Sequence, residues 1–251
     1  MPNTKLTRDK LKNHFQYGKM IYLVILAVAA LIGNLVFTIT VYHAPNERRI
    51  DIELIGIYAD ASTPAAQEAQ AHLLAAGQDW ERARDAASGA DQAEGYEVPL
   101  QELDFLVLQY DPESSSEESY YAAQKFMVML AAQEGDIYVL SRSLMTGLIE
   151  QNIFVPLDDY IASGALDPGD RNLGRVTFDA YDDEGNATGE QHIYALQVDT
   201  LTGMEDALAY NTENKYAVVM QFSQNQDTAV AVLQEMIDLF EAPAQATEAA
   251  E

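Results

Sequence analysis

The sequence predicts an N-terminal transmembrane helix followed by a single α/β domain, a mostly parallel three-layer arrangement that includes a β-hairpin. Three observations lead to this class: one long uncharged apolar segment, alternating strand-like and helix-like patterns after it, and two strand-like arms around a Gly-Asn turn. The chain of 251 residues leaves room for one globular domain, and its 48% hydrophobic content is sufficient for a core.

The apolar segment, MIYLVILAVAALIGNLVFTITVY, runs from Met20 to Tyr42 without a charge. A helix of this length reaches about 34 Å, enough to cross a hydrocarbon layer of ~30 Å. A cleaved signal peptide is the alternative, but its apolar core is usually shorter and ends in small residues at a cleavage site. The basic segment 1–19 precedes the helix, so the N-terminus is expected in the cytoplasm. We therefore expect a signal anchor: a single-pass cell-membrane protein with an extracellular C-terminal domain.

Cysteine content and charge exclude several classes of protein. The chain has no cysteine, which excludes disulfides, Cys-ligated zinc and a thiol nucleophile. Its net charge is −26, and because residues 1–19 carry +4, the chain after the apolar segment carries −30. Affinity for nucleic acid comes largely from neutralising phosphates with basic side chains, so we expect no nucleic-acid partner.

The α/β domain is expected over residues 49–241, after a short linker at 43–48 and before a disordered tail at 242–251. Its first half alternates strands with helices, and this order implies a parallel sheet with right-handed crossovers. The predicted elements are a strand at 49–58, a helix from Pro64 that is capped by Thr63 and stopped by Gly77, a strand at 98–110, a helix at 120–133 ended by Gly135-Asp136, a strand at 137–140 and a helix from Ser143.

The second half is expected to contain a β-hairpin at 176–198, short strands at 207–210 and 217–222, and a helix capped by Asp227. Asp182, Asp183 and Glu184 lie in the hairpin turn, and clustered carboxylates of this kind suit a hard cation such as calcium. A plain turn explains the same residues, so a cation site remains an alternative.

The sequence contains no enzyme signature. The motifs G-x-S-x-G, S-x-x-K, H-E-x-x-H, G-x-G-x-x-G and the P-loop are all absent, and the four histidines are far apart in the chain. We expect a protein without catalytic activity, cofactor or metal.

One stretch, GDIYVLSRSLMTGLIEQNIFVPLDDYI from Gly135 to Ile161, carries a family resemblance. It resembles the segment of extracellular solute-binding proteins of ABC importers in which a helix ends in Gly-Asp, a strand leads to a ligand-facing loop, and a helix ends before a Pro-Leu-Asp-Asp-Tyr-like stretch. The elements from Arg49 to Tyr110 are similar to the opening of the first lobe of this periplasmic-binding-protein fold. Only Ala162 to Gln191 separate the stretch from HIYALQV, so the resemblance implies one lobe on a membrane anchor, without the second lobe.

Candidate ligand-binding residues follow from the expected parallel sheet. In open α/β sheets ligands lie outside the carboxyl ends of the strands, which indicates Tyr58 and Asp60 after the first strand and Tyr138, Ser141 and Arg142 around the third. Aromatic faces with a few directed polar groups suit a sugar or a peptide fragment. The alternative is structural: Arg142 pairs with one of many carboxylates, and Tyr138 fills the core.

Two functions are therefore expected from the sequence. The first is a non-catalytic, solute-binding-like module that presents or senses a small ligand for a transporter, with a permease or another membrane protein as its partner. The second is a structural or assembly subunit of a membrane complex that has lost ligand binding. Aromatic and charged residues retained at the strand ends would favour the first, and an apolar patch at the place where the second lobe should close would favour the second.

Overall fold

The structure, a computed structural model, describes residues 22–34, 44–93, 95–112, 114–168 and 175–241. The chain divides into two units, residues 1–43 and 44–251. Of the predicted transmembrane segment, residues 22–34 are helical, and its remaining residues lie outside the described parts of the chain, as does the predicted tail at 242–251. Within those described parts, no helix is both long and apolar enough to span a membrane.

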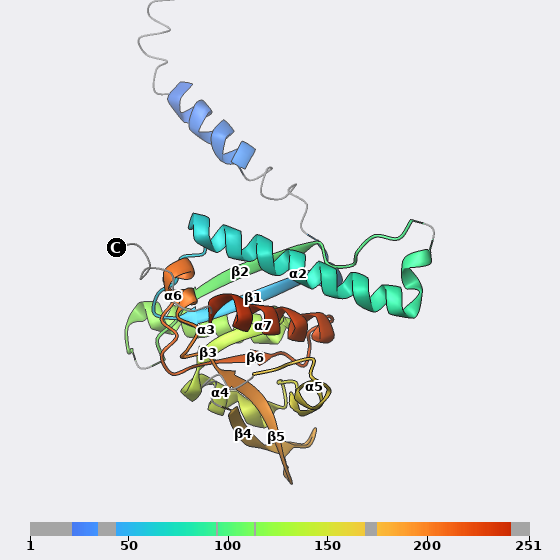
Figure 1. Cartoon of the computed structure of the whole chain (residues 1–251). Coiled ribbons are helices and arrows are strands. Elements are labelled where there is room, and N and C mark those ends of the chain that lie inside the picture. The colour runs from blue at the N-terminus through green and yellow to red at the C-terminus, as the bar shows by residue number, and fades with distance from the viewer. Residues whose placement is uncertain (1–21, 35–43, 94, 113, 169–174, 242–251) are drawn as a thin grey trace, which may run out of the picture. The chain divides into compact units, whose positions relative to one another are not determined.

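A six-stranded sheet forms the centre of the second unit (Figure 1). Its first three strands lie side by side and parallel, with β1 between β2 and β3. This part confirms the prediction from the alternating strands and helices. The six strands, in the spatial order β2-β1-β3-β6-β5-β4, are β1 (Arg49–Gly56), β2 (Glu102–Gln109), β3 (Ile137–Ser141), β4 (Arg175–Tyr181), β5 (Ala187–Gln197) and β6 (Lys215–Val219).

The other half of the sheet is antiparallel, so the prediction of a mostly parallel sheet is wrong there. β6 runs antiparallel to β3, β5 to β6, and β4 to β5. The predicted hairpin is confirmed as β4 and β5. The regular strand–helix alternation is interrupted after α4 (Arg142–Leu148), because β4 and β5 follow each other without a helix between them. Neighbouring antiparallel strands need no crossover helix between them, so the later connections are free to return the chain along the sheet.

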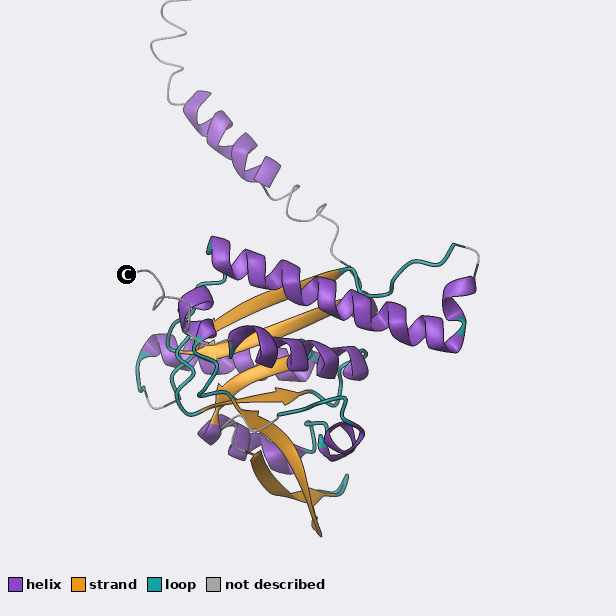
Figure 2. Cartoon of the chain, viewed as in Figure 1, coloured by secondary structure: helices purple, strands orange, loops and turns teal. Residues whose placement is uncertain are grey.

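Helices cover both faces of the sheet, giving three layers (Figure 2). α2 (Pro64–Ser88) and α7 (Gln226–Phe240) pack on the face that carries Ile50, Ile52 and Leu54. α3 (Glu117–Ala132) and α4 pack on the opposite face, which carries Ile55 and Tyr138. Side chains alternate between the two faces along each strand, so one strand supplies both cores. The short helices α5 (Asp158–Ser163) and α6 (Gly203–Leu208) complete the unit.

α2 begins as predicted but ends later. The side chain of Thr63 accepts a hydrogen bond from the backbone N–H of Ala66, and Pro64 occupies the first helical position. The helix then continues through Gly77 to Ser88, because Gly77 is a packing position: an added Cβ would lie 2.7 Å from Leu100 Cδ2. A glycine inside a helix that packs closely is retained despite its cost to helix propensity.

The strand predicted at 207–210 is also wrong, since residues 203–208 form α6. Leu201, Met204 and Leu208 are fully buried. Their spacing of three and four residues is that of a helical turn. The strand predicted at 217–222 is confirmed in part as β6, which starts two residues earlier and ends three residues earlier, at Val219.

Candidate functional site

The carboxyl ends of β1 and β3 place four of the five predicted site residues at accessible positions. Tyr58 follows β1 with 56% of its surface exposed, and Asp60 is partly exposed. Ser141 ends β3, and Arg142, which is exposed, begins α4. Because parallel strands end at the same edge, the structure brings these residues to one edge of the sheet.

The carboxylate of Asp60 serves the local backbone. Its Oδ1 atom accepts hydrogen bonds from the backbone N–H and the hydroxyl of Ser62, at 2.9 Å and 2.6 Å. These hydrogen bonds lower the pKa of Asp60. The backbone N–H of Asp60 donates to the Leu208 carbonyl at 2.7 Å. Asp60 therefore fixes the loop that leads into α2, which is a positioning role.

Tyr138 lies in the core and not at the surface. It is fully buried, its hydroxyl donates to the Glu134 carbonyl at 2.7 Å, and its ring is 6.2 Å from that of Phe126 in α3. Burial raises the pKa of Tyr138. The structure thus separates Tyr138 from the other four residues and gives it the core-filling role that was the alternative in the sequence.

Lys215 is a site residue that sequence reasoning missed. It begins β6 and lies opposite Ser141 in the antiparallel register with β3. Its ammonium group is 5.9 Å from the centre of the Tyr210 ring and is half-buried. Burial lowers the pKa of Lys215, while Asp111 acts in the opposite direction. The sequence could not reveal this neighbour of Ser141, because the pairing of β6 with β3 is antiparallel and comes from a distant part of the chain.

Gly56 and Tyr210 create the place that Lys215 occupies. A Cβ atom on Gly56 would lie 3.0 Å from Tyr210 Cε2, a tight contact, and 3.7 Å from Lys215 Nζ, so the glycine favours the close approach of the Tyr210 ring to the end of β1. The buried hydroxyl of Tyr210 donates toward the carbonyls of Ile55 and Val139, at 2.8 Å and 3.0 Å. Tyr210 therefore joins the ends of β1 and β3 beneath the lysine.

The cations at this edge have no carboxylate within ion-pair distance among the described residues. Neither Lys215 nor Arg142 forms an ion pair in that part of the chain, in contrast to Arg49, whose Nη2 atom is 2.7 Å from Asp51 Oδ2. A half-buried ammonium group beside a serine hydroxyl is suited to an anionic group, because charge-assisted hydrogen bonds are stronger than neutral ones. We define the carboxyl-edge site as Gly56, Tyr58, Ser141, Arg142 and Lys215.

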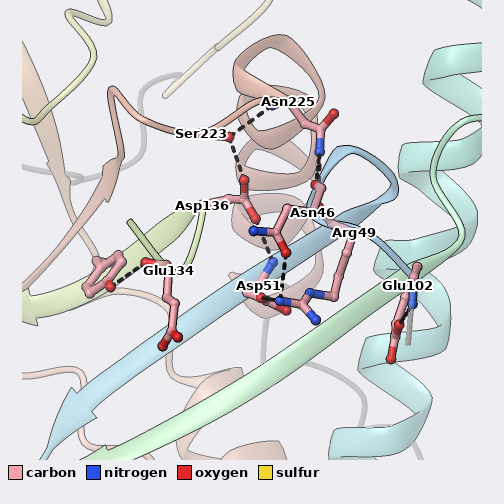
Figure 3. A network of polar contacts seen from close by, with 10 residues as sticks. Asn46, Arg49, Asp51, Glu102, Glu134, Asp136, Ser223 and Asn225 are labelled. Atoms are coloured by element: carbon pink, nitrogen blue, oxygen red, sulfur yellow. Dashed lines mark hydrogen bonds and ion pairs between the residues drawn. The ribbon is translucent and has the colours of Figure 1, made fainter. Parts of the chain in front are cut away.

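A second polar network lies at the opposite, amino edge of the sheet (Figure 3). Asp136, just before β3, accepts hydrogen bonds from the Asp51 backbone N–H at 2.9 Å and from the Ser223 hydroxyl at 2.5 Å. Burial raises the pKa of Asp136, and it raises the pKa of Asp51 to about 6 against the opposing charge of Arg49. From the sequence, Asp136 is expected only at the end of a helix. The sequence RIDIEL of β1, in which Asp51 and Glu53 alternate with apolar residues, is the feature that could have indicated this network.

No group of three or more His, Asp or Glu side chains converges as metal ligands would in the described part of the chain. In the hairpin turn, Asp182 Oδ1 accepts hydrogen bonds from the backbone N–H groups of Glu184 and Asn186, at 3.0 Å and 2.8 Å. These bonds lower the pKa of Asp182 and account for its carboxylate as part of the turn.

No protein-family model matches the chain, and no curated protein matches it in sequence.

Proposed function

We propose that this chain is a membrane-anchored, extracellular, non-catalytic module of the solute-binding type, which holds a small ligand at the carboxyl-edge site for a transporter. One observation carries the proposal: a half-buried lysine without an ion-pair partner among the described residues lies at the ligand-binding edge of an α/β sheet. The resemblance of residues 135–161 to solute-binding proteins and the parallel strands β2-β1-β3 are consistent with it.

The chemistry of the site favours a ligand with an anionic group. Burial makes the charged form of Lys215 less favourable, and an incoming carboxylate offsets that cost through a charge-assisted hydrogen bond. Arg142 adds a second cation at the same edge. The exposed ring of Tyr58 offers an apolar face beside them. A short acidic peptide or an acidic sugar combines these features.

A thermal-shift panel on the full-length protein in mild detergent tests this proposal. We expect glutamate, a glutamyl dipeptide or glucuronate to raise the melting temperature more than glutamine or glucose does. A ligand at 100 times its dissociation constant adds about 2.7 kcal/mol to the free energy of unfolding, which is readily measured as a shift. A panel without any shift would contradict ligand binding at this site.

An assembly role is the second candidate, favoured by one surface. The outer face of α3 exposes Tyr120, Tyr121, Met127 and Val128, each more than half exposed. Lys125 is the only charged residue between Ser119 and Ala132, although the chain as a whole is strongly acidic. The partner on this reading is a membrane protein such as a permease, because the predicted anchor would hold the domain beside such proteins.

The assembly role predicts an effect of Val128→Glu that ligand binding does not. In cells, the variant should lose cross-links to a membrane partner that the wild-type protein forms, while thermal shifts with anionic ligands stay unchanged. Glu118→Gln, at the start of the same helix, serves as the control. Equal cross-linking by wild type and Val128→Glu would exclude α3 as the docking face.

A further inference from the structure

Glu53 is a buried carboxyl group that the carboxyl-edge site does not use. It lies in the middle of β1, opposite Leu106 of β2 and Tyr138 of β3, and only 2% of its surface is exposed. It points to the same face of the sheet as Ile55, the face covered by α3. Among the described residues, none donates a hydrogen bond to its carboxylate, although buried polar groups usually have such a partner.

Gly135 closes the space above Glu53. Its φ of +83° belongs to the left-handed region, and a Cβ atom at this position would lie 2.8 Å from both Glu53 Cγ and Tyr138 Cε2. The turn that contains Gly135 is held by the hydrogen bond from Tyr138 to the Glu134 carbonyl. Gly135 and Tyr138 therefore crowd the Cγ atom of Glu53, and neither of them donates a hydrogen bond to its carboxylate.

The charged groups around Glu53 are mostly of the same sign. Burial raises the pKa of Glu53 to about 7; Asp51 and Glu134 act in the same direction, and Lys125 and Arg49 oppose them. Asp104 of β2 lies opposite Asp51 and raises the pKa of that residue. We call Glu53 and the charged or titratable groups around it the amino-edge cluster. These groups are Arg49 and Asp51 of β1, Asp104 of β2, Lys125 of α3, Glu134 and Asp136 of the turn before β3, and Tyr138 of β3.

The cluster is connected to the point where the chain enters the domain. Asp51 and Asp136 exchange backbone and side-chain hydrogen bonds, and Asp136 continues to Ser223 (Figure 3). The side-chain amide of Asn225 donates to the carbonyls of Asn46 and Arg49, at 2.8 Å and 3.1 Å. The backbone N–H of Asn225 also donates to the Ser223 hydroxyl at 3.2 Å, so hydrogen bonds join Asp136 to the segment 46–49.

We propose that this amino-edge cluster, centred on Glu53, is a proton-operated switch: α3 and the Asp136–Ser223 network pack tightly on β1 while Glu53 is neutral, and loosen when Glu53 becomes charged. The switch goes beyond the proposed ligand site, which lies at the opposite edge of the sheet. It gives the module a response to external pH that needs no ligand.

The direction of the pH effect follows from the proton affinities of the folded and unfolded states. The pKa of Glu53 is about 7 in the folded domain, against an ordinary value of 4.5. The folded state therefore binds the proton more tightly, so this stabilisation is fully present below the unfolded value and is lost as the pH rises to about 7. Asp51 acts in the same direction between its ordinary value of 3.8 and about 6.

Urea unfolding of the full-length protein from pH 5 to pH 8 tests the switch. Glu53→Gln keeps the shape of the neutral side chain, so its advantage over wild type should grow at least about tenfold in the unfolding equilibrium constant between pH 5 and pH 8. Glu68→Gln, an exposed site in α2, should follow the wild-type curve. If Glu53→Gln prevents folding, Asp51→Asn replaces it; its gain over wild type should grow as the pH rises to about 6 and stay constant at higher pH.

Hydrogen exchange of the same proteins distinguishes a local switch from a global effect. With labelling times corrected for the intrinsic rate, peptides covering 46–53, 120–132 and 221–226 should lose protection in wild type at pH 8 and keep it in Glu53→Gln. Parallel stability curves for wild type and Glu53→Gln, or equal protection at both pH values, would overturn the proposal.

Discussion

Gly135, just before β3, is a crowded glycine at the amino edge of the sheet. It combines a left-handed backbone with close approach to Glu53 and Tyr138, and either feature alone disfavours a side chain. The Gly135-Asp136 pair thus has a local physical reason: the glycine lies against Glu53, and Asp136 joins β1 to the loop before α7.

Gly135→Ala should lower the free energy of unfolding by about 2 to 4 kcal/mol, because it adds overpacking to left-handed strain. Gly164→Ala is a matched control, since Gly164 has a similar φ of +78° and nothing within 4 Å of an added Cβ. That control should cost only about 1 kcal/mol. Equal losses in urea unfolding of the two variants would show that crowding at Gly135 has no effect.

The candidate site was only partly predictable at the residue scale. Tyr58, Ser141 and Arg142 could be placed at the carboxyl edge because the order of strands and helices determines where parallel strands end. Tyr138 was placed there wrongly, because a four-residue apolar strand does not reveal which of its side chains face a covering helix. Lys215 was missed because its position depends on a long-range antiparallel pairing.

At the scale of elements, Glu81 joins α2 to its neighbours. Its carboxylate is almost fully buried and accepts hydrogen bonds from the Leu100 backbone N–H at 2.6 Å and from the Thr228 hydroxyl at 2.9 Å. These partners lie before β2 and in α7. The extension of α2 beyond Gly77, which the sequence did not predict, is what brings Glu81 to both of them.

Glu81→Ala should destabilise the domain by about 2 to 4 kcal/mol, because it leaves two buried donors without an acceptor. Glu81→Gln keeps one acceptor oxygen and should cost less, about 1 kcal/mol. Glu68→Ala, exposed on the same helix, should change the free energy of unfolding by no more than about 0.5 kcal/mol. Thermal or urea unfolding of the three variants measures these losses of unfolding free energy. Equal losses in all three would contradict the role of Glu81 as a buried hydrogen-bond acceptor.

The elements that were predicted correctly are those with local signals. The cap at Thr63 with Pro64, the apolar run of β3 and the turn of the hairpin all depend on neighbouring residues. The elements that were predicted wrongly depend on tertiary contacts. From the sequence, Gly77 predicts the end of a helix, but in the structure it is a packing position against Leu100 and Val232. The order of the strands beyond β3 has no local sequence signal.

For the whole molecule, the basic N-terminus and the predicted anchor predict how the chain is oriented in a membrane. The basic segment 1–19 before the predicted anchor predicts a cytoplasmic N-terminus, with the chain after the anchor outside the cell. Protease added to intact cells should remove the chain beyond Tyr42 and spare an N-terminal tag. An uncleaved chain in intact cells that is cleaved after lysis would reverse the predicted orientation.

The acidic surface also bears on the proposed ligand. Long-range repulsion of an anion is screened beyond about 8 Å at physiological ionic strength, so the nearest groups, Lys215 and Arg142, decide whether it binds. Binding of an anionic ligand by these two residues is the central claim of the proposed function.

The most direct test of that claim is calorimetric titration of the full-length protein with the anionic panel member that gives the largest thermal shift. Lys215→Met should weaken binding by roughly 10- to 100-fold, the loss expected for one charge-assisted hydrogen bond. Lys125→Met removes the only other lysine after residue 43 and should bind like wild type. Equal affinities for wild type and Lys215→Met would contradict the claim.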